Sequence, residues 1–210
     1  MSVVGIVPAA GRGERLGSDR PKAFVVCAGR PLIEWSLDVL RSVCDRVVVA
    51  VPEGVSYPDS VVGGPVRSDS VRRALAAAPE ATVAVVHDAA RPFLTRSLLE
   101  RCIAGLEGFD GAIAAARVTD TVKEADGDGR VRRTLDRSTL WAIQTPQVFD
   151  AAVLRGALDR PLTALETATD DSALVEAAGG SVRVVEAPPE NFKVTSPADL
   201  ERAARALLAS

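Results

Sequence analysis

Residues 3–22 read VVGIVPAAGRGERLGSDRPK, an apolar strand that runs directly into a turn rich in glycine and cations. Gly11 and Gly13 permit backbone turns that a β-carbon obstructs, so successive N–H groups can converge on an oxyanion. Arg15 and Lys22 add full positive charge. The spacing matches neither the P-loop nor the dinucleotide fingerprint with its third glycine. The stretch therefore predicts a binding site for a nucleoside triphosphate that uses neither of these two motifs. Gly-x-Gly alone, however, also suits an ordinary strand-to-helix turn.

Length, charge and cysteine content restrict the class of protein. The 210 residues fit one domain, and a hydrophobic content of 47% supplies its core. A net charge of −3 argues against nucleic acid or an acidic membrane as a partner. The three cysteines are widely spaced and form no zinc motif with the single histidine. This cysteine usage suits a reduced, cytoplasmic protein. Since no apolar run is long enough to cross a bilayer, we expect the protein to be soluble.

The remaining sequence alternates strand-like and helix-like segments. Such alternation is typical of an α/β fold with a mostly parallel sheet, and runs of Val and Ala indicate that both sheet faces are covered. The predicted strands are 3–7, 46–51, 82–87, 111–116 and 181–186. The predicted helices are 31–42, 68–78, 95–108, 150–158, 171–178 and 197–208. Because no linker or repeat interrupts this order, we expect a single domain over residues 1–210.

Residues 117–140 break the pattern. They are polar and carry Gly127 and Gly129 around Asp128, which predicts a two-stranded arm with a turn at its tip. An isolated hairpin is marginally stable in water. We therefore expect the arm to pack on something else, most naturally a second subunit.

Candidate ligand-binding residues follow the predicted strands, because ligands bind an open parallel sheet at the carboxyl ends of its strands. Those ends are 8–13, the Gly63-Gly64 turn and 87–92. Asp88 could hold a cation while Arg91 contacts an anionic substrate. Alternatively, the two side chains form only a surface salt bridge with each other. His87, which ends a buried strand, is expected to be structural rather than a catalytic base.

Further polar residues lie on the arm and beyond it. Thr121 and Thr145 can donate hydrogen bonds to phosphate, and Arg137 can clamp phosphate with a bidentate fork, although a solvated hairpin and a turn would also explain them. Lys193 lies in a short apolar segment, where an exposed edge lysine is the ordinary reading. Asp170 and Asp171 most simply begin a helix.

Taken together and in this order, these segments resemble the 2-C-methyl-D-erythritol 4-phosphate cytidylyltransferase family, and the resemblance runs nearly end to end. The first block alone is typical of sugar nucleotidyltransferases in general, whereas the later blocks are more specific. The blocks are 9–15, Pro21-Lys22, 69–71, 87–92, Asp120-Thr121, Asp136-Arg137, 145–147, 169–171 and 191–195.

The resemblance implies a Rossmann-like, three-layer nucleotidyltransferase fold and an enzyme that uses CTP and 2-C-methyl-D-erythritol 4-phosphate. It implies nucleotide contacts from Ala9, Ala10, Gly11, Arg12, Gly13, Gly64, Ser70 and Ala89. The catalytic cations would be Arg15, Lys22 and Lys193. The substrate would be bound by Asp88, Arg91, Thr121, Arg137 and Thr145, with Asp88 also at a magnesium ion. In a homodimer, the arm would carry Thr121 and Arg137 to the partner's site.

The residue types agree with this reaction. A phosphate monoester is largely a dianion at neutral pH and is already a nucleophile, so its in-line attack on the α-phosphorus of CTP requires mainly positioning and charge neutralisation. Three residues depart from the family pattern: Ala23, and Pro65-Val66 after the Gly-Gly turn. Pro65 has no backbone N–H to offer a base.

Other functions remain open from the sequence. A cytidylyltransferase for another polyol phosphate, such as ribitol 5-phosphate, would differ mainly in its acceptor pocket. A nucleotide-binding protein without catalysis would not need Lys22, Asp88 and Lys193 together. A nicotinamide-binding protein would leave the two lysines without a role.

Overall fold

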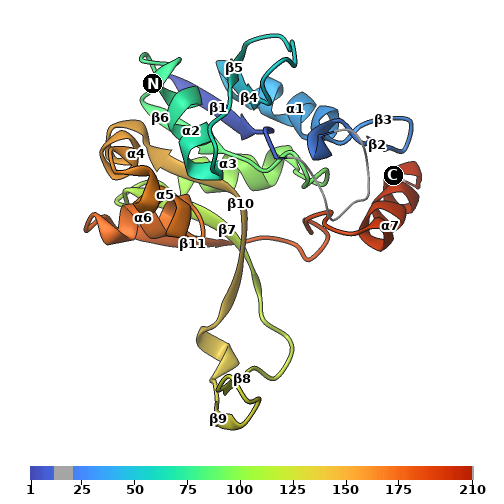
Figure 1. The fold of residues 1–210 in the computed structure, drawn as a ribbon, viewed down its shortest axis with the longest axis vertical. Helices are drawn as coiled ribbons and strands as arrows, with labels where there is room; N and C mark the ends of the chain where they lie inside the picture. The colour runs from blue at the N-terminus through green and yellow to red at the C-terminus, as the bar shows by residue number, and fades with distance from the viewer. Residues whose placement is uncertain (12–20, 210) are drawn as a thin grey trace.

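The computed structural model describes residues 1–11 and 21–209, and a seven-stranded sheet forms the centre of this part of the chain (Figure 1). The strand order is β11-β7-β10-β6-β1-β4-β5. All neighbours pair in parallel except β10, which is antiparallel to both β6 and β7. The strands are β1 (Val3–Pro8), β4 (Arg46–Val51), β5 (Ser60–Val62), β6 (Val83–Val86), β7 (Gly111–Arg117), β10 (Trp141–Asp150) and β11 (Val182–Glu186). The prediction of a mostly parallel α/β sheet is confirmed.

Helices cover both faces of the sheet. Along β1, Val3 and Val7 join one apolar cluster whereas Val4 and Ile6 join the other, because successive side chains of a strand point to opposite faces. The first cluster packs under α1 (Leu32–Val43) and α3 (Arg96–Ala104). The second packs under α2 (Arg67–Ala76), α4 (Ala151–Leu158), α5 (Leu162–Thr167) and α6 (Asp171–Ala177). The result is the three-layer arrangement that the resemblance implied.

A smaller unit flanks the sheet beside α1. It consists of the short helix η2 (Lys22–Phe24), the hairpin β2 (Val26–Cys27) and β3 (Arg30–Pro31), and the last helix α7 (Pro197–Leu208). Cys27, Leu32, Val194 and Ala203 form its apolar core. Helix α7 begins with a capping box of Ser196 and Asp199, with proline at its first turn. This unit holds the segment before α7 against the body of the molecule.

Strand β10 was not predicted, because its middle residues look like a turn. Gln144 and Gln147 are polar, and Pro146 lacks the N–H that a central strand needs. The structure accommodates the proline where the pairing of β10 with β7 shifts register between Ile143 and Gln147. All four residues from Gln144 to Gln147 are buried, so the polar segment lies inside the sheet rather than on a surface turn.

The predicted arm is present and projects away from the body, as the lower part of Figure 1 shows. It contains the antiparallel pair β8 (Lys123–Ala125) and β9 (Val131–Thr134), followed by the short helix η3 (Arg137–Thr139). Gly129 has a φ of 80° in the turn at the tip. Most side chains of the arm are exposed in this single chain. In the described residues, no helix has the length and apolar character needed to span a membrane.

Candidate functional site

A cleft of about 1130 Å³ lies along the carboxyl edge of the parallel strands. Since β6, β1, β4 and β5 are neighbours in that order, the segments that follow them reach one edge together. The cleft is lined by Pro8–Gly11, Lys22, Ala23, Pro52, Glu53, Val62–Arg67, Ser70, Arg73, Asp88–Ala90, Lys193 and Thr195. Nine of the predicted site residues therefore meet in one place: Ala9, Ala10, Gly11, Lys22, Gly64, Ser70, Asp88, Ala89 and Lys193.

The loop after β5 comes so close to its neighbours that only glycine fits. A β-carbon on Gly63 would lie 2.4 Å from the β-carbon of Ala10, and one on Gly64 would lie 1.9 Å from Asp69 Oδ2. The Gly64 N–H donates to Ser70 Oγ at 3.0 Å. The Asp69 carboxylate is fully buried and is held by two arginines of α2, Arg72 and Arg73. The loop is thus fixed against both the β1 loop and α2.

Asp88, the residue after His87 at the end of β6, is the centre of the charged part of the cleft. Its carboxylate pairs with Arg67 Nε at 3.1 Å and with Lys193 Nζ at 2.7 Å. Burial alone would raise the pKa of Asp88, but the charges of Arg67 and Lys193 outweigh burial and hold that pKa below its ordinary range. Asp88 is therefore a carboxylate at neutral pH.

Arg67 is a site residue that the sequence analysis missed. It is the first residue of α2, and its Nη1 lies 2.6 Å from Oδ2 of Asp171, the first residue of α6. Asp170 and Asp171 begin a helix as expected, Asp170 as the cap and Asp171 as the first residue, and the Asp171 side chain is fully buried. Arg67 thus joins α6 to Asp88. Arg67 and Asp171 are 104 residues apart, and no local spacing signals their pairing.

Thr145, on β10, contacts both Asp88 and His87. The Asp88 N–H donates to Thr145 Oγ1 at 3.0 Å. His87 Nε2 faces the Arg91 carbonyl at 3.1 Å, and Nδ1 faces Thr145 Oγ1 at 3.1 Å. Because a carbonyl only accepts, Nε2 carries the proton and Thr145 donates to Nδ1. His87 is fully buried, and burial lowers its pKa to about 4, so it is the neutral structural residue that the sequence indicated.

Arg91 is buried and reaches the segment that carries Lys193. Its Nη1 donates to the Asn191 carbonyl at 2.8 Å, and Asn191 Nδ2 donates to the Thr145 carbonyl at 2.9 Å. The Val194 N–H donates to the Ala90 carbonyl at 2.8 Å. These bonds fasten 191–194 to the turn after β6, which explains why Lys193 faces Asp88 rather than lying on a sheet edge. The expectation that Arg91 and Thr145 bind the substrate stays a prediction.

The other predicted site residues lie elsewhere. Thr121 and Arg137 belong to the arm, where the Arg137 guanidinium donates to the Thr119 carbonyl. Arg12, Gly13 and Arg15 lie outside the described residues.

The donor set around Asp88 fits magnesium. In the described parts of the chain, no three His, Cys, Asp or Glu side chains gather as a metal cage. Magnesium commonly uses one or two protein carboxylates together with substrate phosphates and water. A single carboxylate in a cleft lined by cations is therefore a suitable partial site for magnesium that arrives with a nucleotide.

Comparisons with known proteins give one consistent result. Residues 3–209 match the model of the family described as "IspD: 2-C-methyl-D-erythritol 4-phosphate cytidylyltransferase". A relative of that name from Nocardia farcinica is 46% identical over 96% of this chain and 92% of its own, and one from Rhodococcus jostii is 44% identical over 94% and 92%. The crystal structure of the Thermus thermophilus enzyme of that name superposes with a TM-score of 0.85 at 36% identity, with each chain fully covered.

Proposed function

Because the chain belongs to the 2-C-methyl-D-erythritol 4-phosphate cytidylyltransferase family, we infer that its cleft joins CTP and 2-C-methyl-D-erythritol 4-phosphate. The products are 4-diphosphocytidyl-2-C-methyl-D-erythritol and pyrophosphate. The family favours this reaction over the ribitol phosphate and non-catalytic alternatives. The observation that carries the proposal is the convergence of Lys22, Lys193 and Asp88 on one cleft.

The reaction needs no side-chain nucleophile. The phosphate of the acceptor is largely a dianion at neutral pH and attacks the α-phosphorus of CTP directly. One P–O bond forms to the acceptor phosphate, and the bond to the pyrophosphate oxygen breaks. The main barrier is the approach of two anions, which fixed positive charge lowers.

We assign that positive charge to Lys22, Arg15 and Lys193. Lys22 lines the cleft beside the loop after β1, so it suits the triphosphate and the leaving pyrophosphate, together with Arg15. Lys193 lines the same cleft, where its ammonium lies 2.7 Å from the Asp88 carboxylate. Arg67, anchored on Asp171, keeps Asp88 oriented and adds a further cation at the cleft.

Magnesium is proposed to bind through Asp88 and the phosphates of CTP. When bound, it would supply additional positive charge to the developing pentacoordinate phosphorus. Asp88 suits this role because its carboxylate is ionised at neutral pH.

The arm is proposed to complete the site of a second subunit. The arm projects from the body (Figure 1), and its Thr121 and Arg137 do not line the cleft of the same chain. A homodimer in which each arm reaches the partner would give both residues a substrate phosphate to bind. The cytoplasm is the proposed compartment, because all three cysteines are free and buried.

Pyrophosphate release tests the proposed reaction. Purified protein with magnesium and CTP should release pyrophosphate with 2-C-methyl-D-erythritol 4-phosphate and far more slowly with ribitol 5-phosphate. Release with ribitol 5-phosphate alone would contradict the acceptor assignment. Silence with every nucleotide and acceptor pair would contradict catalysis itself.

A further inference from the structure

Lys22 is carried by a helix that is too short to be stable by itself. The helix η2 has three residues, and its cap forms no side-chain hydrogen bond. Two of its backbone bonds are long: the Lys22 N–H donates to the Gly11 carbonyl at 3.3 Å, and the Val25 N–H donates to the Lys22 carbonyl at 3.3 Å. Since a single turn of 3₁₀-helix is weakly bonded, the position of Lys22 depends on how the side chains beside it pack.

Phe24, the last residue of this helix, provides such packing together with Ala23. Ala23 is buried in the apolar cluster under α1, and Phe24 packs against the same cluster. The Phe24 ring also contacts the ring of Tyr57, with 5.8 Å between the ring centroids and 58° between the ring planes. This separation and tilt are typical of a favourable aromatic pair. The helix that carries Lys22 is therefore held partly by Tyr57, which lies in the loop between β4 and β5.

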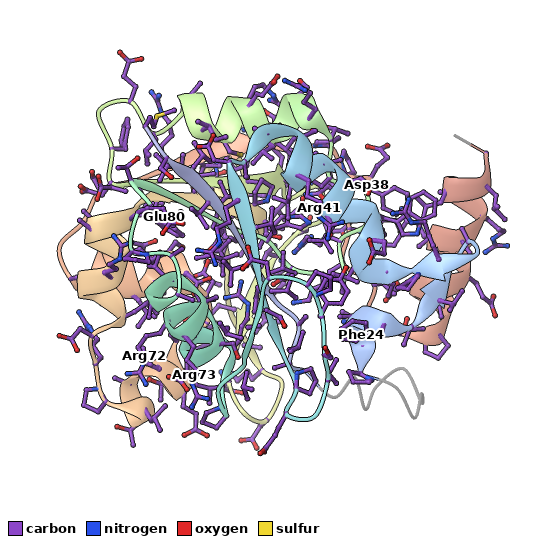
Figure 2. All side chains as sticks on the ribbon, turned by 90° about the horizontal axis from the view of Figure 1, so that it is seen from above. Phe24, Asp38, Arg41, Arg72, Arg73 and Glu80 are labelled. Carbon is purple, nitrogen blue, oxygen red and sulfur yellow. The ribbon has the colours of Figure 1, made fainter. Side chains whose placement is uncertain are left out.

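Tyr57 is itself fixed by its hydroxyl and its backbone. The hydroxyl donates to the Glu34 carboxylate on α1, and Arg41 Nη1 lies 3.6 Å from the other oxygen of that carboxylate. Ser60 Oγ donates to the Tyr57 carbonyl at 2.6 Å. Burial and the Glu34 carboxylate raise the pKa of Tyr57, so the hydroxyl keeps the proton that it donates. Phe24 and Arg41, the two ends of this series of contacts, are labelled in Figure 2.

The described lining of the cleft includes Lys22 but neither Phe24 nor Tyr57, so Tyr57 has no direct part in the proposed reaction. We propose that Tyr57 is a positioning residue that acts through Phe24 to hold the Lys22 ammonium in the cleft, an inference that rests on the proposed function. The charge that Lys22 neutralises develops in the transition state. A misplaced ammonium therefore lowers kcat more than it raises KM for CTP.

Kinetics of the full-length protein test the proposal in three backgrounds. Tyr57→Leu removes both the aromatic pair and the hydroxyl, and it should lower kcat about tenfold with KM for CTP within about threefold of wild type. Tyr57→Phe keeps the ring and loses only the bond to Glu34, so its kcat should fall about threefold. In Lys22→Met, Tyr57→Leu should cause no further loss of kcat, whereas in Lys193→Met it should again cost about tenfold.

Phe109→Leu is the matched control for the loss of an aromatic ring. Phe109 is partly exposed, with the Arg183 guanidinium over its ring. It precedes β7 and therefore lies at the amino edge of the parallel strands, opposite the cleft. This variant should keep both kcat and KM for CTP within twofold of wild type.

Acetylation of the lysines tests the same proposal without turnover. The chain has only three lysines, Lys22, Lys123 and Lys193, so mass spectrometry after brief treatment with acetic anhydride resolves each one. Lys123, on the arm, serves as the internal reference. Relative to Lys123, Tyr57→Leu should change the acetylation rate of Lys22 at least threefold and that of Lys193 less than twofold.

Two results would overturn the proposal. One is a Tyr57→Leu change that lowers kcat less than twofold, or that lowers it as much in Lys22→Met as in wild type. The other is an acetylation rate of Lys22 that does not respond to Tyr57→Leu. If wild type releases no pyrophosphate with CTP, the proposed function fails, and the acetylation rate alone then decides whether Tyr57 positions Lys22.

Discussion

His87 is held neutral by its surroundings. It is fully buried, its Nε2 faces a carbonyl, and its pKa is lowered to about 4 by burial. An unfolded histidine titrates near pH 6.5. Between pH 6.5 and 4, His87 is protonated in the unfolded chain but stays neutral in the folded chain. The free energy of unfolding therefore falls as the pH is lowered.

This predicts a pH-dependent difference between wild type and His87→Gln. Going from pH 7.5 to pH 5, wild type should lose about 2 kcal/mol of unfolding free energy through His87 that the variant does not lose. Urea unfolding at both pH values measures it, and the variant's own loss corrects for other groups, including Asp88 and Asp171. Equal losses in both proteins would show that His87 does not stay neutral in the fold.

Single residues of the site were predicted from the opening stretch, from the strand ends and from the family blocks. Lys22 follows the first strand, Asp88 follows β6, and Lys193 received its role from a family block; all three line the cleft. Arg67 was not predicted, because its partner Asp171 is 104 positions away and its importance depends on the fold bringing two helix starts together. Thr145 was predicted from the blocks, but its bond to the Asp88 N–H is a property of the tertiary structure.

The loop between β5 and α2 depends on the absence of a side chain. Gly64→Ala would place a β-carbon 1.9 Å from the buried Asp69 carboxylate, which two arginines hold in place. We expect a loss of about 1–3 kcal/mol of stability and weaker CTP binding, because the loop must shift. Denaturant unfolding and CTP titration measure the two effects.

Gly127→Ala provides the matched control for that change. Gly127 lies at the tip of the arm with nothing within 4 Å of an added β-carbon. Its substitution should change stability by less than about 0.5 kcal/mol. If both alanine variants behave alike, the close approach at Gly64 does not matter for the fold.

Within the central sheet, the strands with a regular apolar pattern were predicted and those without one were not. The five predicted strands correspond to β1, β4, β6, β7 and β11 within a residue or two. Strand β10 was missed because Pro146 and two glutamines interrupt its pattern, and their burial depends on neighbours on both sides. Strand β5 was missed because it has only three residues, none of them fully buried.

At the scale of the whole molecule, an arm shared between subunits predicts that two inactive variants regain activity when they are mixed. Arg137→Ala should damage the partner's site, whereas Lys193→Met should damage the site of its own chain. In a mixed dimer, one site then carries both changes and the other carries none. After subunit exchange, an equal mixture should regain about a quarter of wild-type activity, because half of the dimers are mixed and each has one intact site. An equal mixture that stays inactive would contradict an arm shared between subunits.

Charge neutralisation in the cleft is tested most directly by the turnover number of Lys193→Met and Lys22→Met with CTP and 2-C-methyl-D-erythritol 4-phosphate. Arg205→Met removes an exposed cation on α7 and serves as the control. Each lysine variant should lose roughly 10²–10³ in kcat, as enzymes do on losing one preorganised charge-stabilising group, while the control keeps its activity. A kcat within twofold of wild type in both lysine variants would contradict catalysis by these fixed charges.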